Sequence, residues 1–241
     1  MALSHSPQIV RDGLVLYLDA ANIKSYPGTG TSWANLSSNN FNATMHGSVP
    51  FTTDIAKCFD FSTATGANTA NSSLGFTFTN NMIPTTGNFT LSSWLKNLNS
   101  SSGQVGLFSN AGSADGYRFG VGLNGIYYLI GPTYKEGTIN FLSSISAALW
   151  SNVTVVFSRT TLEILLYLNG QYQGMTTLSA PQSAFTNTAP GIVRNPCCTI
   201  YTGKISNISA YNRALSANEI KKNFEALRGR HLVWVYSQDL K

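Results

Sequence analysis

Apolar and polar residues alternate along much of this chain, in short segments separated by Gly, Asn, Ser and Pro. Within 13–20 (GLVLYLDA), every second residue from Leu14 to Leu18 is leucine. A period of two is typical of a β-strand that buries one face. The same criterion predicts further strands over 57–62, 75–79, 88–97, 150–159 and 203–212.

Two Asn-Gly dipeptides each lie between a pair of strand-like segments. The dipeptides are Asn124-Gly125, between YRFGVGL and IYYLIG, and Asn169-Gly170, between LEILLYL and QYQGM. Asn-Gly favours a two-residue type I′ turn, because both turn residues need positive φ. The sequence therefore predicts two β-hairpins. Because no strand alternates with a helix, we exclude the parallel α/β classes and expect a two-layer antiparallel sandwich.

One helix is predicted near the C-terminus. Ser216 and Glu219 match the S-x-x-E capping box, in which the hydroxyl accepts the amide of residue 219 and the carboxylate accepts the amide of residue 216. Leu215 and Ile220 are spaced for a hydrophobic staple, and Gly229 is expected to end the helix as its C′ residue.

The predicted helix carries one narrow apolar stripe, because Ile220, Phe224 and Leu227 recur at helical spacing. The residues expected to face water are Lys221, Lys222, Asn223 and Glu225. A helix this short is marginal in isolation, so we expect it to dock on the sandwich.

The 241 residues contain no linker-like stretch, so we expect one domain. Its expected parts are an N-terminal arm at 1–12, the sandwich at 13–230 and a C-terminal tail at 231–241. The tail carries the apolar run LVWVY, in which Trp234 and Tyr236 are candidate assembly contacts. This run either adds as an edge strand of its own sandwich or pairs with a neighbouring protein.

Charge and hydropathy exclude several classes of partner. Charged residues make up only 10% of the chain, and the basic residues behind its net charge of +5 are scattered. A nucleic-acid footprint needs basic residues gathered on one face, so no nucleic-acid partner is expected. No apolar run is long enough to span a membrane and no signal-peptide pattern occurs, which predicts a soluble product made in the cytoplasm.

Candidate catalytic and metal-binding chemistry is sparse. No two of the ten acidic residues are spaced to share a strand face, whereas glycoside hydrolysis needs two carboxylates about 5–10 Å apart. A pair assembled from different strands stays open. The histidines His5, His46 and His231 lack ligand spacing and are interpreted as surface or terminal residues. We therefore predict no catalytic residue, no metal site and no cofactor. Three cysteines are expected to be free thiols, namely Cys58, Cys197 and Cys198.

Four aromatic residues allow two interpretations. Tyr127 and Tyr128, with Trp94 and Trp150, either form a sugar-stacking platform or pack in the core. Successive strand residues face opposite sides, so at least one of the two tyrosines is expected to be buried.

Five segments in order resemble the laminin-G-like, concanavalin A-like jelly-roll domains. They are GLVLYLDAANIKSYPGTGTSWANLS, NFTLSSWLK, NVTVVF, LYLNGQYQG and GKISNISAYNRALSANEI. The resemblance runs from about residue 13 to 228. It implies an all-β, two-layer antiparallel jelly-roll sandwich with one short C-terminal helix that covers an open end or edge of the sandwich.

Two segments, SYPGTGTSWANLS and YNRALSANEIKKNFEALRGR, look more specifically like the standalone copies in virion proteins of tailed bacteriophages, including those of cyanobacteria. This resemblance implies a non-enzymatic virion protein, a capsid decoration or fibre-associated surface subunit assembled in the host cytoplasm. Its implied partners are capsid or fibre subunits, further copies of itself and host glycans. The alternative function is a carbohydrate-binding lectin domain for host attachment, and the third is a glycan-cleaving enzyme.

Two departures from the family pattern bear on calcium. Family members often carry an F-D-G-x-D-D stretch, whereas FDFSTATGAN (59–68) keeps Asp60 and lacks the acidic pair. Many also have an acidic residue where this chain has Ser206 or Asn207. Losing these acids removes the anionic oxygens that calcium prefers, so no calcium site is expected, and the ligand-binding residues stay unassigned.

Overall fold

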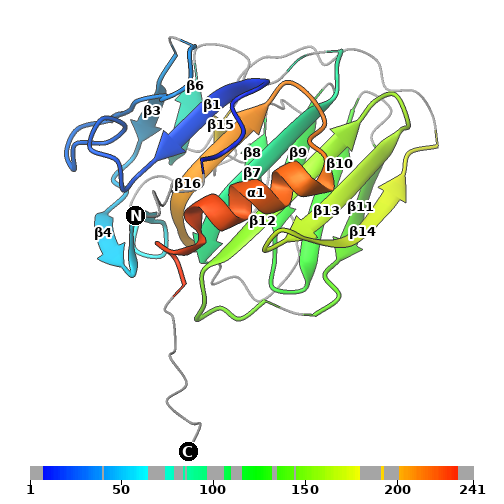
Figure 1. Ribbon diagram of the computed structural model, residues 1–241. Helices are drawn as coiled ribbons and strands as arrows, with labels where there is room; N and C mark the ends of the chain where they lie inside the picture. Colours follow the sequence, from blue (N-terminus) through cyan, green and yellow to red (C-terminus); the bar gives the residue numbers. More distant parts are fainter. Residues whose placement is uncertain are drawn as a thin grey trace, which may run out of the picture.

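The computed structural model describes residues 8–39, 41–64, 74–78, 84, 86–96, 106–109, 116–131, 135–143, 145–179, 191–192 and 201–232. These residues form two antiparallel β-sheets packed face to face, with one helix outside them (Figure 1). The expected fold class, an all-β antiparallel sandwich with one short C-terminal helix, is confirmed.

Sheet A carries the helix on its outer face. Its strand order is β14-β13-β12-β7-β16-β5-β4, and β1 pairs with β16. The strands are β1 (Leu14–Asp19), β4 (Phe51–Asp54), β5 (Ala56–Asp60), β7 (Phe89–Lys96), β12 (Ser151–Ser158), β13 (Glu163–Leu168), β14 (Gln171–Thr177) and β16 (Lys204–Tyr211).

Sheet B forms the other layer, in the order β11-β10-β9-β8-β15-β6-β3-β2. Its strands are β2 (Ser32–Trp33), β3 (Ala43–His46), β6 (Gly75–Phe78), β8 (Gly106–Ser109), β9 (Tyr117–Val121), β10 (Gly125–Ile130), β11 (Lys135–Asn140) and β15 (Gly191–Ile192).

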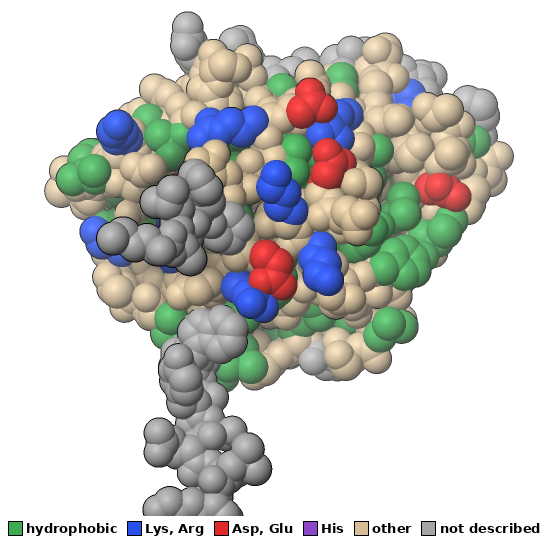
Figure 2. Space-filling model, viewed as in Figure 1, with side chains coloured by type: hydrophobic (Ala, Val, Ile, Leu, Met, Phe, Trp, Pro, Cys, Tyr) green, Lys and Arg blue, Asp and Glu red, His purple; other side chains and the backbone are tan. Residues whose placement is uncertain are grey.

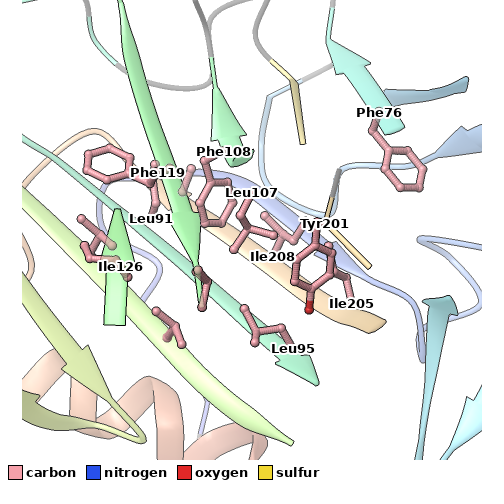
Figure 3. Packing of buried hydrophobic residues seen from close by; sticks show 14 of the residues in the cluster. Phe76, Leu91, Leu95, Leu107, Phe108, Phe119, Ile126, Tyr201, Ile205 and Ile208 are labelled. Carbon is pink, nitrogen blue, oxygen red and sulfur yellow. The ribbon is translucent and has the colours of Figure 1, made fainter. Parts of the chain in front are cut away.

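The main hydrophobic core lies between the sheets, because alternate residues of each strand point inward. Phe89 of β7 faces Phe119 of β9 with ring centroids 6.2 Å apart, and Phe59 of β5 meets Phe76 of β6 at 5.0 Å. Figure 3 shows aliphatic and aromatic side chains from both sheets interdigitating in this layer. The sandwich therefore rests on close packing of large apolar side chains.

Helix α1 (Ala217–Arg228) lies across the outer face of sheet A (Figure 1). Phe224 stacks on Trp94 of β7 with ring centroids 5.5 Å apart, and Leu215 and Ile220 pack together in a cluster with residues of β12, β13 and β16. The expectation that the helix covers an open end or edge of the sandwich is therefore wrong. Outward apolar side chains of sheet A, among them Trp94, Val156 and Tyr211, lie under the helix, which shields them from water.

Three details of the helix were tested by the structure. The Ser216 hydroxyl accepts the Glu219 amide, and a Glu219 carboxylate oxygen accepts the Ser216 amide at 2.9 Å, so both halves of the capping box are present. Asn223, expected to face water, is buried instead, and its Oδ1 accepts the Val10 amide at 2.8 Å. Gly229 follows the last helical residue, Arg228, but its φ of −62° is right-handed. The helix therefore ends without the left-handed C′ glycine that the sequence predicted.

The two predicted hairpins form with different turns. Asn169 and Gly170 have φ values of 51° and 75°, as a type I′ turn requires. Gly170 also lies close under Phe224, where a Cβ would crowd the helix. In the other hairpin, Gly125 already belongs to β10 and pairs with Asn140, and neither it nor Asn124 has positive φ. The type I′ prediction is therefore wrong at that turn.

Candidate functional site

Two acidic side chains of the β4–β5 hairpin, Asp54 and Asp60, lie near the same ammonium group. The Lys204 ammonium lies 2.7 Å from Asp54 Oδ2 and 3.6 Å from Asp60 Oδ2, and Lys96 lies 3.1 Å from Asp54 Oδ2. Burial raises the pKa of Asp54, but the hydrogen bonds from Lys204 and Lys96 outweigh it and hold the pKa below its usual value. A general acid needs a raised pKa, so the environment of Asp54 does not suit that role.

A second ion pair ties the residues after α1 to sheet A. Asp19 is 3% exposed, and Arg230 Nη1 lies 2.8 Å from its Oδ2. Tyr17 Oη donates to the same oxygen at 3.3 Å. Both oxygens of the Asp19 carboxylate have partners within the fold. Its ion pair with Arg230 anchors the residues after α1 to sheet A.

The candidate sugar-stacking residues are all buried. Trp94 and Trp150 lie under α1 in a cluster with Phe224, while Tyr128 packs between the sheets. Tyr127 points to the other side of sheet B but is only 7% exposed. The core-packing interpretation is therefore correct, and these rings do not form an exposed platform.

His231, interpreted above as a surface or terminal residue, is 1% exposed. Its ring stacks on Trp94 at 4.2 Å between centroids and meets Trp150 edge-on at 5.5 Å. The earlier interpretation is wrong because the chain after α1 turns back onto sheet A, which sequence spacing alone does not reveal.

One line of register partners, which we call the outer row, crosses the outer face of sheet B, and six of its eight residues are polar. Each member lies beside the next in the strand pairing, and the alternate positions of the same strands point into the core. The row consists of Ser32, Thr44, Thr77, Gly191, Ser109, Arg118, Leu129 and Glu136.

The two ends of the outer row are open and its centre is closed. Thr44 and Glu136, near opposite ends, are exposed, whereas Ser109 and Arg118 are each 3% exposed. His46 Nε2 lies 2.7 Å from Thr77 Oγ1, and this imidazole is exposed as well. The described part of this face therefore offers polar groups to solvent at both ends.

Tyr127 supports the Glu136 end of the outer row. Its hydroxyl donates to Glu136 Oε2 at 2.6 Å, and its register partner on β11 is the exposed Thr138. A carboxylate held by one donor keeps acceptor capacity for others, and a neighbouring hydroxyl both donates and accepts. Hydroxyl-rich ligands need this combination of groups.

Ser206 and Asn207, the neutral residues considered above for a calcium site, both donate hydrogen bonds to backbone carbonyls. Ser206 Oγ donates to the Lys57 carbonyl at 2.8 Å, and Asn207 Nδ2 donates to the Leu18 carbonyl at 2.9 Å. Within the described part of the chain, no three His, Cys, Asp or Glu side chains are grouped to hold a metal ion.

Several predicted residues lie outside the described ranges. Among the cysteines, Cys58 is a buried free thiol, and burial raises its pKa to about 12. The residues outside the described ranges are His5, Cys197, Cys198, Trp234 and Tyr236. Sequence reasoning missed the outer row altogether, because its members belong to strands far apart in sequence. The alternation within 75–79 was the only signal that Thr77 points outward.

Comparison with known proteins identifies the class. The model of the concanavalin A-like lectin/glucanases superfamily matches residues 68–221. Since this is more than half of the chain, the protein belongs to that superfamily. No match was found among curated proteins. The one helix of the described residues is too short and too polar to cross a membrane.

Solved structures with the same fold include binding domains of toxins. The binding domain of botulinum neurotoxin DC in complex with rat synaptotagmin II has 15% sequence identity and a TM-score of 0.66 over 90% of this chain. The binding domain of Paraclostridial Mosquitocidal Protein 1 has 15% identity and a TM-score of 0.65 over 89%. Botulinum neurotoxin type C, whose cell entry depends on interaction with two ganglioside molecules, has 16% identity and a TM-score of 0.66 over 90%. This chain spans 52% of each of these chains, and the likeness establishes the shared fold.

Proposed function

We propose that this protein is a non-enzymatic, glycan-binding domain whose ligand lies on the outer face of sheet B. The outer row, with His46 beside Thr77, is the observation that carries the proposal, since it presents hydroxyl and imidazole groups at one end and a carboxylate at the other on the face opposite the helix. A sugar presents alternating donors and acceptors, which these groups can match. The similar domains named above are binding domains, and one of those toxins depends on gangliosides.

The absence of catalysis is part of the proposal. The carboxylates Asp54 and Asp60 share one ammonium group, and Asp19 is paired with Arg230. Glu136 lies on the proposed ligand face, where its hydrogen-bond partner is the hydroxyl of Tyr127 and not a second carboxyl group. A hydrolase requires two cooperating carboxyl groups at the bond to be cleaved. A reducing-sugar assay should therefore show no release of product.

A glycan array tests the binding function. The wild-type chain is expected to bind at least one class of oligosaccharide, and Glu136→Gln and His46→Ala are each expected to weaken that binding about tenfold through a lost hydrogen bond to a charged or polar group. Lys222→Ala is the matched control, because Lys222 is exposed on α1 on the opposite side of the sandwich. Absence of binding to every glycan, or equal loss in the control, contradicts the proposal.

We further propose that the domain works on the surface of a tailed-phage particle, as a capsid decoration or fibre-associated subunit. The phage-like segments of the sequence support this role. Mass spectrometry of purified particles is expected to detect the protein, and its absence from them contradicts the virion role alone.

A further inference from the structure

The turn between β4 and β5 holds a strained residue. Asp54 pairs with Ala56, so Ile55 alone forms the turn, and its φ is 63°. A β-branched residue rarely adopts positive φ, because its side chain then crowds the neighbouring backbone. No other β-branched residue within the described ranges does so. Strain of this kind persists where surrounding contacts fix the backbone, and it is concentrated at sites that hold another group.

A hydrogen bond from a distant loop fixes this turn. The Trp150 indole N–H donates to the Asp54 carbonyl oxygen at 2.7 Å. This bond joins the residue before Ile55 to the residue after Leu149, so the two apolar side chains lie at the same end of the sandwich. Ile55 is 53% exposed and Leu149 is 60% exposed. Ile55 is therefore both strained and exposed, and contact with an apolar group would offset the cost of its exposure.

The described chain ends beside this turn. Leu232 packs on the apolar cluster that contains Trp150 and Ala56. Figure 1 shows β4 and the segment after α1 at the same end of the sandwich, and Figure 2 shows hydrophobic side chains on the surface at the lower end of this view. We call Ile55, Leu149 and Leu232 the end patch.

The segment that best fits the end patch is the run that follows it in the chain. Residues 232–236 read LVWVY, five consecutive apolar residues without a charge. An extended chain advances about 3.3 Å per residue, so Trp234 lies within about 7 Å of Leu232 and can reach the neighbouring side chains. A tethered segment meets its site at a high effective concentration, whereas a separate peptide has to be bound from solution. The covalent link therefore favours this run over any free partner.

We propose that residues 233–236 fold back onto the end patch, with Trp234 covering Ile55 and Leu149. The apolar run then belongs to its own domain, neither as an edge strand nor as a contact with another protein. A glycine at position 55 would form the turn without strain but would offer no side chain for this contact. The proposal is independent of the glycan function, because the outer row lies on sheet B.

Quenching of tryptophan fluorescence by acrylamide tests the proposal in the full chain. Trp33, Trp94 and Trp150 are each at most 2% exposed, so quenching reports on the remaining tryptophan, Trp234. The wild type is expected to resist quenching. Ile55→Asn is expected to weaken docking of the run about tenfold through the lost apolar contact, and so to raise the quenching constant. Asparagine tolerates positive φ, so the turn should be retained.

Met175→Asn is the matched control. Met175 is an apolar residue that is 42% exposed on β14, at the edge of sheet A opposite to β4. Its replacement should leave the quenching constant unchanged. In a chain truncated after Leu232, which lacks Trp234, Ile55→Asn should not change quenching either.

Thermal midpoints of the same chains separate the contact from the turn. Ile55→Asn relieves the backbone strain in both the full and the truncated chain, but only in the full chain does it also remove a contact with Trp234. The shift in midpoint should therefore be less favourable in the full chain. Equal shifts in the two chains would mean that position 55 and the run do not interact, and would overturn the proposal.

Three quenching results would also overturn the proposal. The first is a wild-type Trp234 as accessible as in the urea-unfolded chain, and the second is an equal effect of Ile55→Asn and Met175→Asn. The third is a protection that disappears on dilution, because the run would then dock on a second copy. Circular dichroism of each variant verifies that the fold is retained.

Discussion

The imidazole of His231 is enclosed between the indole rings of Trp94 and Trp150. Its Nδ1 donates to the Leu227 carbonyl at 3.0 Å, while Nε2 is buried with no hydrogen-bond partner among the described residues. Burial lowers the pKa of His231 to about 4, outweighing the hydrogen bond to the Leu227 carbonyl, which raises the pKa, and the nearby Arg230 cation acts in the same direction as burial. The folded protein therefore holds this histidine in its neutral form.

Acid should loosen the chain end through this residue. Because the native pKa is below the value of 6.5 for an unperturbed histidine, the unfolded chain binds the proton first. The stabilisation is complete above pH 6.5 and is lost as the pH falls toward 4, by up to about 3 kcal/mol. Urea titrations of the wild type at pH 7 and pH 4.5 should show this loss. His231→Phe should lose much less stability over the same interval, and equal losses would contradict the assignment.

The capping box makes its own contribution at the residue scale. The hydrogen bonds from Arg213 and from the Ser216 amide lower the pKa of Glu219 to about 2. The stabilisation from its charge is therefore complete above pH 4.5 and is lost as the pH falls toward 2, mostly below the range in which His231 titrates. Replacing Ser216 with Ala should cost about 1 kcal/mol of unfolding free energy through the lost cap.

At the scale of the element, α1 is held by its apolar stripe more than by its cap. Phe224 lies against Trp94 and the Gly170 turn. Phe224→Ala should therefore cost about 3 kcal/mol, clearly more than Ser216→Ala. Chemical denaturation of the two variants measures both effects, and equal, negligible values would mean that the helix does not stabilise the sandwich.

An element could be predicted from the sequence where the residues that determine it are close together in the chain. The start of α1 depends on Ser216, Glu219 and their neighbours, so a local pattern was sufficient. The docking position of α1 depends on Trp94 and Gly170, which are distant from it in sequence, and the placement that the family resemblance implied was wrong. Asn124-Gly125 matched the turn pattern, yet the pairing of Gly125 with Asn140 drew that glycine into β10. Tertiary pairing there overrides the local preference.

At the scale of the whole molecule, both chain ends of the described part belong to the packed unit. Truncation after Leu232 keeps His231 between its two tryptophans, whereas truncation after Arg230 removes it. We expect the shorter chain to melt several degrees lower than the longer one, as loss of a buried aromatic side chain predicts. Identical thermal midpoints would show that the contacts of His231 add no stability.

The candidate ligand face could not be found from the sequence, because the outer row exists only once the strands of sheet B are paired. The side chains of Ser206 and Asn207 donate hydrogen bonds to backbone carbonyls. No metal-binding cluster occurs in the described ranges. A chelator should therefore leave the thermal midpoint unchanged. A drop with EDTA that calcium restores would contradict this expectation.

The most direct test of the central claim is an NMR titration of the full chain with the oligosaccharide that binds best on the array. The account predicts saturable shifts at the backbone amides of Thr44, Thr77 and Thr138, on the outer face of sheet B. Amides of α1, such as that of Lys222, should stay unchanged. Shifts confined to α1, or to the β14 edge, would contradict the claim that the outer row holds the glycan.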